Sequence, residues 1–434
     1  MLISKFPCQF FHFLRKEIKS KETFLAAQKN KTSFIRNRKL NLENLIWFFL
    51  SQIRSSIQVE LNRYFGELHN DGMPYEHITD VAFCKAKDKL NPNVFRHLIN
   101  KAAKFYYETK KIKTWRKLKV LAIDGSLCRL PHVDDLDDHF GTWKGHNQTP
   151  RGMCRGTLVY DALNNITTDA LYTPKDQGER KAASNLLDNM PKDSILLMDR
   201  GYPAFWLFHE IIEKGQDFLV RAKMDENSFI TDFWNSNKTD MIVEFPTKRR
   251  YYKGSQYNDL TKKGFKVRLI KSKDFRKRPM VLMTTILDQS VSRDELVDLY
   301  KLRWSAEENY KVLKSKLNVE HISSKKPNGA YCDFYAKTLF LIIGQMIASK
   351  TSQHFEQIQE DYVHPCKINM SKYLSHFKDF FLKFYKKKCI EKTSKSFIEL
   401  VIKYHCPIRK GRHFERGKNR VDIPRYILNY RPLS

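Results

Sequence analysis

The segment SRDELVDLYKLRWSAEENYKVLKSKL, residues 292–317, carries the clearest pattern in the chain. Its apolar side chains recur every three or four positions, which is typical of an amphipathic helix that packs one face on a core. Ser292, followed three positions later by Glu295, forms a helix-capping pattern. The sequence therefore predicts one continuous helix, with the apolar stripe Leu299, Leu302, Ala306, Tyr310, Leu313 and Leu317.

A second row of side chains runs beside this stripe. Its members are Tyr300, Arg303, Glu307, Lys311 and Lys314, which at about 100° per residue fall within a sector of about 80°. A carboxylate on a rigid support, with cations along the same edge, suits a metal-binding group flanked by groups that hold phosphate. The alternative is an ordinary exposed helix face with paired Glu and Lys side chains. Glu308 is the second-choice carboxylate, since it points about 100° away from Glu307.

Two buried runs earlier in the chain each lead into an aspartate. KVLAIDGS, residues 119–126, predicts a strand with Asp124 at its carboxyl end, and SILLMDRGY, residues 194–202, predicts a second strand that ends in Asp199. With a hairpin and a helix between them and a helix after the second, the order matches an RNase H-like α/β core. In that topology Asp124 and Asp199 meet at neighbouring strand ends, and Glu307 arrives from a helix across the sheet edge. A single such carboxylate more often caps a turn, so the set of three indicates catalysis.

The spacing Tyr-x2-Arg-x3-Glu-x6-Lys, formed by Tyr300, Arg303, Glu307 and Lys314, resembles the signature of the DDE insertion-sequence transposases of the IS-four family. DGS at Asp124 and DRGY at Asp199 resemble the first two acidic motifs of that family. Ala306 departs from the family pattern, in which a larger aliphatic residue usually precedes the glutamate. The three motifs occur in the family's order.

The resemblance implies a catalytic and metal-binding set of Asp124, Asp199 and Glu307. Cleavage of a phosphodiester needs an activated attacking oxygen and a stabilised leaving oxygen, and two Mg²⁺ ions supply both. Oxygen ligands suit Mg²⁺, for which Mn²⁺ substitutes, and we expect Asp124 to bridge the two ions. The expected DNA-binding residues are Tyr300, Arg303, Lys314, Lys311 and Trp234.

The resemblance also implies cut-and-paste transposition. Water frees a 3′-OH at the element end, a hairpin step on the second strand is expected, and the 3′-OH then attacks target DNA. The implied partners are double-stranded DNA, as terminal inverted repeats and as target, and a second copy of the chain in the DNA complex. Two alternatives stay open: an RNase H-like nuclease without strand transfer, and an inactivated relative that only binds DNA.

Charge and cysteine usage agree with a nucleic-acid partner. The 434 residues include 78 Lys and Arg against 48 Asp and Glu, a net charge of +30, which favours a polyanionic ligand. A membrane-surface protein or a ribosomal-type RNA binder is the competing interpretation. The eight cysteines show no Cys-x2-Cys, which disfavours a zinc site and a disulfide framework. The opening segment lacks a signal-peptide pattern and the apolar run 338–348 is short, so we expect a soluble, cytoplasmic prokaryotic protein without a membrane span.

The same patterns predict the domain organisation. Short helices before residue 117 predict a helical DNA-binding domain in which Lys85, Lys87 and Lys89 lie on a recognition or phosphate-contacting helix. The alternative is a helical bundle with a solvated basic face. Four strand-like runs between Asp199 and Glu307 predict a β-rich insertion, where Trp234 either stacks on a flipped base or packs on the sheet. The predicted units are 1–30, basic and unassigned; 31–116, the DNA-binding domain; 117–224, the first part of the core; 225–285, the insertion; 286–350, the second part with the Glu307 helix; and 351–434, a basic helical region with a tail.

Overall fold

The fold is seen in a computed structural model. It describes residues 5–36, 38–52, 55–69, 78–108, 112–144, 150–223, 227–245, 264–273, 278–355, 364–385 and 390–408. The chain divides into two compact units. The first, here the helical unit, comprises residues 1–109, 127–154 and 311–434; the second, here the sheet unit, comprises residues 110–126 and 155–310.

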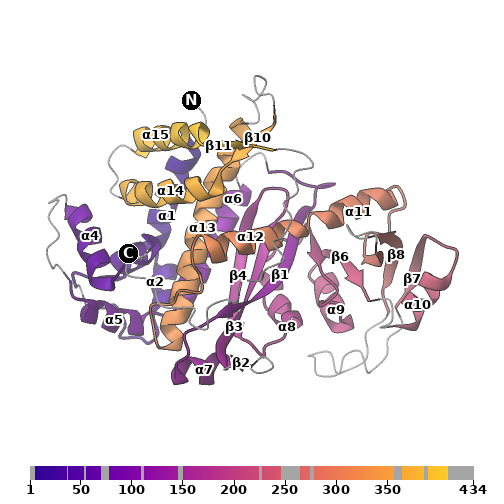
Figure 1. The fold of residues 1–434 in the computed structure, drawn as a ribbon, viewed down its shortest axis with the longest axis horizontal. Helices are drawn as coiled ribbons and strands as arrows, with labels where there is room; N and C mark the ends of the chain where they lie inside the picture. The colour runs from indigo at the N-terminus through magenta and orange to yellow at the C-terminus, as the bar shows by residue number, and fades with distance from the viewer. Residues whose placement is uncertain are drawn as a thin grey trace, which may run out of the picture. The chain divides into compact units, whose positions relative to one another are not determined.

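A nine-stranded sheet forms the centre of a mixed α/β fold (Figure 1). Its order is β2-β3-β1-β5-β6-β9-β8-β7, with β4 paired to β3. β1, β5 and β6 are parallel, whereas β9, β8 and β7 continue the sheet in antiparallel pairs. The predicted order of strand, hairpin, helix, strand and helix is found. The strands are β1 Lys119–Arg129, β2 Thr142–Trp143, β3 Arg151–Asp161, β4 Ile166–Pro174, β5 Ser194–Met198, β6 Asp217–Ala222, β7 Asp240–Glu244, β8 Lys266–Lys273 and β9 Pro279–Thr284.

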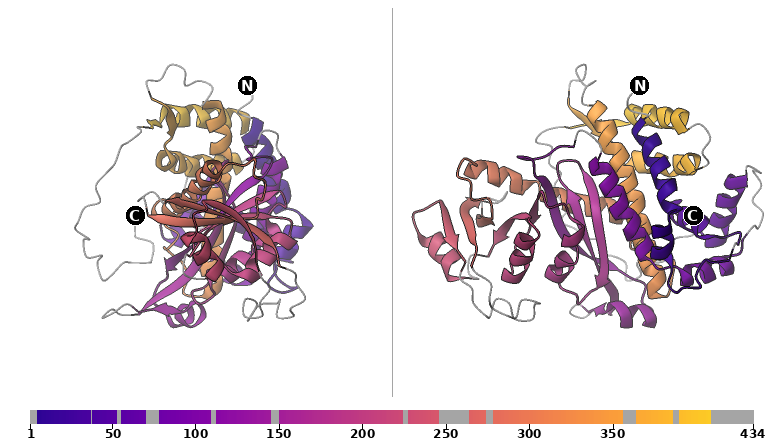
Figure 2. Two further views of the ribbon diagram at one scale, coloured as in Figure 1. Left: turned by 90° about the vertical axis from the view of Figure 1, so that its right-hand side faces the viewer. Right: turned by 180° about the vertical axis from the view of Figure 1, so that it is seen from behind.

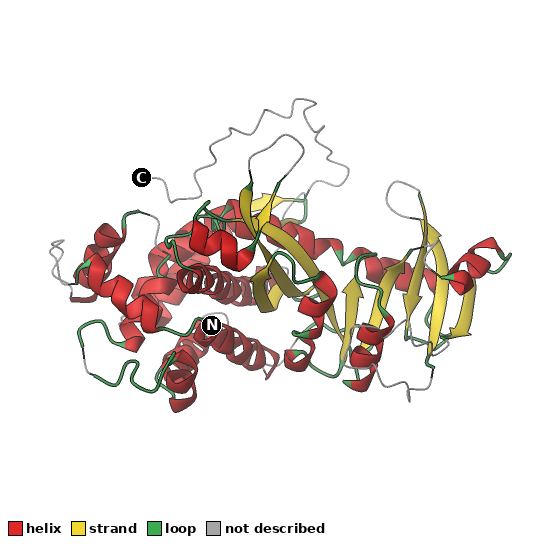
Figure 3. Ribbon diagram, turned by 90° about the horizontal axis from the view of Figure 1, so that it is seen from below, coloured by secondary structure: helices red, strands yellow, loops and turns green. Residues whose placement is uncertain are grey.

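The four strand-like runs that follow Asp199 are β6, β7, β8 and β9. They extend the central sheet instead of forming a sheet of their own, because β6 pairs with both β5 and β9. The arrows of these strands lie side by side in Figure 3. The helix α10, Ser228–Asn235, precedes β7.

Alternating side chains of the strands supply two apolar faces. Leu121 and Ile123 of β1 pack in one cluster with the helices α8, Glu179–Ser184, and α9, Phe205–Glu213, and with α10. Val120 and Ala122 pack on the opposite face, with α11, Arg293–Lys301. Figure 1 shows α9 and α11 on opposite sides of the strands. A short 3₁₀ helix, Leu187–Asn189, follows α8.

The prediction of a single helix over residues 292–317 is wrong. The structure has two helices, α11 and α12, Trp304–Ser315, separated at Leu302 and Arg303. There the amide of Leu302 bonds the carbonyl of Leu299, and the amide of Arg303 bonds that of Tyr300, at 3.1 and 3.0 Å. These bonds span three residues instead of four, which tightens the turn and ends the α-helix. The expected cap is present, since the Ser292 hydroxyl accepts from the Glu295 amide at 3.1 Å.

The helical unit is built on α13, Pro327–Phe355, and α6, Asn93–Glu108, which run side by side in Figure 2. The predicted apolar run lies inside α13, where residues such as Leu339 and Ile343 are fully buried. Among the described residues, no helix is long and apolar enough to cross a membrane. The other elements of this unit are α3 Leu42–Leu50, α4 Ile57–His69, α5 Asp80–Lys89, α7 Asp134–Phe140, β10 Cys366–Ile368, α14 Met370–Tyr385, α15 Ile390–Lys403 and β11 His405–Pro407.

The N-terminal stretch that received no assignment forms two helices, α1, Lys5–Ile18, and α2, Lys21–Ala27. Phe10, Leu14 and Ile18 recur at helical spacing and are buried, so α1 packs an apolar face against the rest of the helical unit. The tail of the predicted basic region, residues 409–434, lies outside the described residues.

Candidate active site

The register of two parallel strands brings Asp124 and Asp199 to the same level of the sheet. Ala122 of β1 lies opposite Leu197 of β5, so two positions further along Asp124 lies opposite Asp199. Asp199 directly follows β5, as predicted. Asp124 does not end its strand, because β1 continues to Arg129, next to β3. Asp124 lies two residues beyond Ala122, the last residue of β1 that pairs with β5. The edge of β1 that faces β5 is therefore unpaired at Asp124, as it would be at the end of a strand.

Hydrogen bonds fix the turn after β5. The Gly201 amide donates to Asp199 Oδ1 at 2.7 Å. Arg180 Nε of α8 donates to the Gly201 carbonyl at 3.0 Å. The Asp199 carboxylate is therefore held by its own turn, and that turn is tied to α8.

Glu307 lies in the first turn of α12, and side chains of that helix tie it to the strands. The Tyr310 hydroxyl donates to the carbonyl of Gly156 at 2.5 Å and lies 3.0 Å from the carbonyl oxygen of Asp124. Asn309 Nδ2 donates to Thr167 Oγ1 of β4 at 2.8 Å. These bonds place the Glu307 backbone relative to β1. The third carboxylate therefore lies on a helix that packs against the strands, as predicted.

Arg303 connects the cation row to the carboxylates. Its Nη2 donates to Glu307 Oε1 at 2.7 Å, and the guanidinium side chain is only 13% exposed. Burial raises the pKa of Asp124 from 3.8 to about 7; the charge of Arg303 lowers it, and the nearby carboxylates of Glu307 and Asp199 raise it further. The Asp124 carboxylate therefore interacts electrostatically with Arg303, Glu307 and Asp199. Tyr300 lies beside the same groups, and burial raises the pKa of its phenol to about 12.

The three carboxylates have the chemistry of a divalent-cation site. They offer hard oxygen ligands, which suit Mg²⁺ or Mn²⁺, and their mutual repulsion is offset when a cation binds. The raised pKa of Asp124 is the sign of that repulsion together with burial. Asp124, Asp199 and Glu307 therefore suit a metal of this kind by donor type, and their ligand oxygens do not all lie within 4.8 Å of one another in the metal-free chain.

A basic cavity of about 950 Å³ adjoins this group within the sheet unit. Asp199, Tyr300 and Arg303 line it, which connects the predicted site residues to a space that accepts a ligand. Trp304 also lines it and is 42% exposed. Five further cations come from separate places in the chain, so sequence spacing did not reveal them: Arg200, Arg221, Lys273, Arg278 and Lys301.

Three other predicted DNA-binding residues, Lys311, Lys314 and Trp234, are not among those that line this cavity. Lys311 and Lys314, at the end of α12, belong to the helical unit, where Lys314 Nζ donates to the Leu127 carbonyl at 2.6 Å and lies 3.5 Å from Glu320. Trp234 is partly buried against the core of the sheet unit, and Lys271 Nζ lies 5.4 Å from its ring centre. Trp234 therefore packs on the sheet, which is the second of the two roles considered for it.

The predicted phosphate-contacting helix is α5, with Thr79 as its N-cap. Lys85 and Lys89 are exposed, as expected. The expectation for Lys87 is wrong, because it lies on the same face as Phe83, is 4% exposed, and places Nζ 5.4 Å from the Phe83 ring centre.

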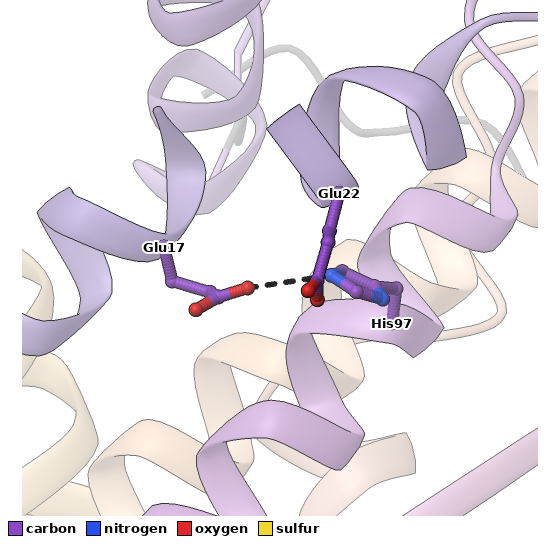
Figure 4. A group of neighbouring side chains, drawn as sticks. All are labelled: Glu17, Glu22 and His97. Carbon is purple, nitrogen blue, oxygen red and sulfur yellow. Dashed lines mark ion pairs between the residues drawn. The ribbon is translucent and has the colours of Figure 1, made fainter. Parts of the chain in front are cut away.

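A second acidic group, in the helical unit, does not resemble a metal site. Figure 4 shows Glu17, Glu22 and His97, which come from α1, α2 and α6, with Glu17 Oε1 3.5 Å from His97 Nε2. Lys101 offsets part of the negative charge of this cluster, since its Nζ lies 3.6 Å from Glu17 Oε1 and also pairs with Glu22. We assign it an ion-pair role between helices.

Comparison with known proteins gives the family of this chain. Residues 115–343, more than half of the chain, match the family described as Transposase DDE domain. The chain therefore belongs to the DDE transposase family. Transposase InsG for insertion sequence element IS4, from Escherichia coli (strain K12), is 23% identical over 308 residues, which span 68% of this chain and 67% of that protein.

A solved structure also resembles the chain, at a greater distance. It is the cryo-EM structure of a piggyBac transposase synaptic complex with hairpin DNA, with 12% identity over 90% of this chain and 85% of that one. The TM-score of 0.44 is too low to support an argument about the fold.

Proposed function

We propose that this chain is a DNA transposase that moves an insertion sequence by cut-and-paste transposition. The observation that carries the proposal is the group Asp124, Asp199 and Glu307, joined by Arg303 and open to a basic cavity. Membership of the DDE transposase family supports it. We further propose that the sheet unit is an RNase H-like core, since parallel strands β1, β5 and β6, with β3 next to β1 and β4 paired to β3, are the arrangement such a core needs.

The residues divide the work. Asp124, Asp199 and Glu307 would hold two Mg²⁺ ions, which activate an attacking oxygen and stabilise a leaving oxygen when bound. Arg303 holds Glu307 through Oε1, and its planar guanidinium suits a phosphate oxygen pair. Tyr300 and the cavity cations hold the DNA backbone near Asp199. The substrates are terminal inverted repeats and target duplex, and two copies of the chain act on paired ends.

The test is cleavage of a duplex that carries the element's terminal repeat, with Mg²⁺ and with Mn²⁺. The full chain is expected to nick at the repeat end, and Asp199→Asn is expected to bind the duplex without nicking it. Incubation with a labelled target plasmid then detects strand transfer. Nicking without joining would identify a nuclease, and binding without nicking by either protein would identify a DNA-binding relative.

A further inference from the structure

A fourth carboxylate lies between the two aspartates and is not part of the family's acidic motifs quoted above. Glu179, the first residue of α8, packs against the glycines that follow Asp124 and Asp199. A Cβ built on Gly125 would lie 3.3 Å from Glu179 Cγ. A Cβ built on Gly201 would lie 3.1 Å from Glu179 Oε2 and 3.0 Å from Asp199 Oδ1. Glu179 therefore fills the space that a side chain at either glycine would need.

Arg155, from β3, holds this carboxylate. Its Nη1 donates to Glu179 Oε1 at 2.5 Å, and its side chain is 16% exposed. Nη1 would also lie 3.5 Å from a Cβ at Gly125, so the guanidinium reaches the position next to Asp124. Glu179 Oε2 faces the Asp199 side and accepts no hydrogen bond from the described residues. One charged pair thus spans both glycine positions.

Tyr202 links this pair to the same group of charges. It is 1% exposed, and its hydroxyl has no hydrogen-bond partner among the described residues. Burial raises the pKa of the phenol, and the carboxylates of Asp124, Glu179 and Asp199 raise it further, whereas Arg155 lowers it. The hydroxyl is therefore close to all four charged side chains. The carboxylates of Asp124 and Asp199 repel Glu179 and attract Arg155, so the charges of the pair and of the two aspartates act on one another.

We propose that Arg155 and Glu179 form a positioning pair that fixes the separation and direction of Asp124 and Asp199 for binding divalent cations. Glu179 keeps the Gly125 position of β1 and the turn that contains Gly201 apart, and Arg155 offsets the repulsion between Glu179 and the aspartates. The inference rests on the proposed function, because it assumes that the aspartates bind metal. It assigns Glu179 a role through its neighbours, and the metal ligands remain the three motif carboxylates.

The test measures Mn²⁺ binding to the full chain with terminal-repeat DNA, by electron paramagnetic resonance. Glu179→Gln keeps the shape of the side chain and removes its charge, and Arg155→Met leaves Glu179 unpaired. Each is expected to weaken Mn²⁺ binding by about 10- to 100-fold, the usual effect of losing a group that orients metal ligands. The double variant is expected to be no weaker than the worse single variant, because the two side chains act as one unit. Nicking by either variant is expected to recover at high Mg²⁺.

Two controls frame the result. Asp199→Asn should abolish the binding that the pair only weakens. Asp193→Asn removes a comparable ion pair, with Lys119, at the opposite end of β1 and β5 and should leave Mn²⁺ binding unchanged. Thermal unfolding checks that each variant folds. If Glu179→Gln does not fold, Gly201→Ala takes its place, since its Cβ would displace Glu179 or Asp199.

Unchanged Mn²⁺ binding in folded Glu179→Gln would overturn the inference. Weakening in Glu179→Gln but not in Arg155→Met would also overturn it, because Glu179 would then act as a ligand without its partner. Equal Mn²⁺ binding by the wild-type chain and Asp199→Asn would overturn the metal site of the proposed function, and the positioning role with it.

Discussion

The two ends of β1 and β5 carry opposite electrostatic arrangements on the same pair of strands. At the amino end, Lys119 Nζ lies 2.5 Å from Asp193 Oδ2, and the Lys119 amide bonds the Asp193 carbonyl at 2.8 Å. At the carboxyl end, Asp124 and Asp199 lie at one level, and burial raises the pKa of Asp124 to about 7. The amino end satisfies its charges internally. The carboxyl end gathers like charges that Arg303 offsets only in part, and such a group of perturbed carboxylates is typical of a functional site.

The largest difference between the ends should appear in catalysis. We expect Glu307→Gln and Asp199→Asn to lower the rate of nicking by about 1,000-fold or more, because each removes a charged ligand from a group that acts as a unit. Asp193→Asn serves as the matched change at the other end and should keep the rate within about twofold. Single-turnover nicking at saturating DNA and Mg²⁺ measures both. A Glu307→Gln protein with wild-type rates would break the assignment of this end.

Arg303 should have the next largest effect. Its guanidinium is 13% exposed and bonds Glu307, so Arg303→Met leaves that carboxylate without its partner. A hydrogen bond to a charged group contributes about 1.5–3 kcal/mol, which corresponds to a loss of nicking of about 10- to 100-fold. Arg303→Lys should lie between the two, because lysine keeps the charge but not the planar pair of donors. Equal rates for all three proteins would show that Glu307 needs no partner.

The sequence predicted the elements that carry the three carboxylates, because each carboxylate follows a signal that depends on near neighbours. Asp124 and Asp199 follow apolar runs, and Glu307 lies beside an apolar helical stripe. The break between α11 and α12 was missed, because a few hydrogen bonds around Leu302 decide it and no proline or glycine marks it. The helical periodicity correctly joined Glu307, Lys311 and Lys314 on one helix, α12, but it did not show that the boundary between the two compact units falls within that helix.

Residues that meet only through tertiary structure were invisible in the same way. Arg221 and Lys273 lie on different strands and line one cavity because β6 and β8 both pair with β9. Arg155 and Glu179 come from β3 and α8, and no spacing rule joins them. The apolar face of α1 could have been predicted from the sequence, since Phe6, Phe10 and Leu14 recur at helical spacing.

The comparison also predicts a dependence of stability on pH. In the metal-free chain the pKa of Asp124 is raised above its ordinary value of 3.8 to about 7 by burial. Between these values the unfolded chain has lost the proton that the folded chain retains. The free energy of unfolding should therefore fall as pH rises from about 4 to about 7 and then level off.

Asp124→Asn removes this dependence. The variant should be more stable than the wild-type chain at about pH 8, by on the order of 4 kcal/mol, and similar to it at about pH 4. Urea unfolding in the presence of a chelator measures the difference at both pH values. An identical pH dependence in the two proteins would show that Asp124 titrates normally and that the carboxyl end carries no such cost.

The smallest effect belongs to the amino end. Asp193 is 57% exposed, so its ion pair with Lys119 is screened by solvent. Asp193→Asn should lower the free energy of unfolding by less than about 1 kcal/mol, because exposed pairs contribute little. Thermal unfolding measures this change, and it should be independent of added Mg²⁺. Asp199→Asn is expected to change the effect of Mg²⁺ on stability relative to the wild-type chain. If Asp193→Asn changed that effect by as much, the two ends would be coupled through β1 and β5. The amino end would then be part of the cation site, and its charges could not be treated as a separate stabilising pair.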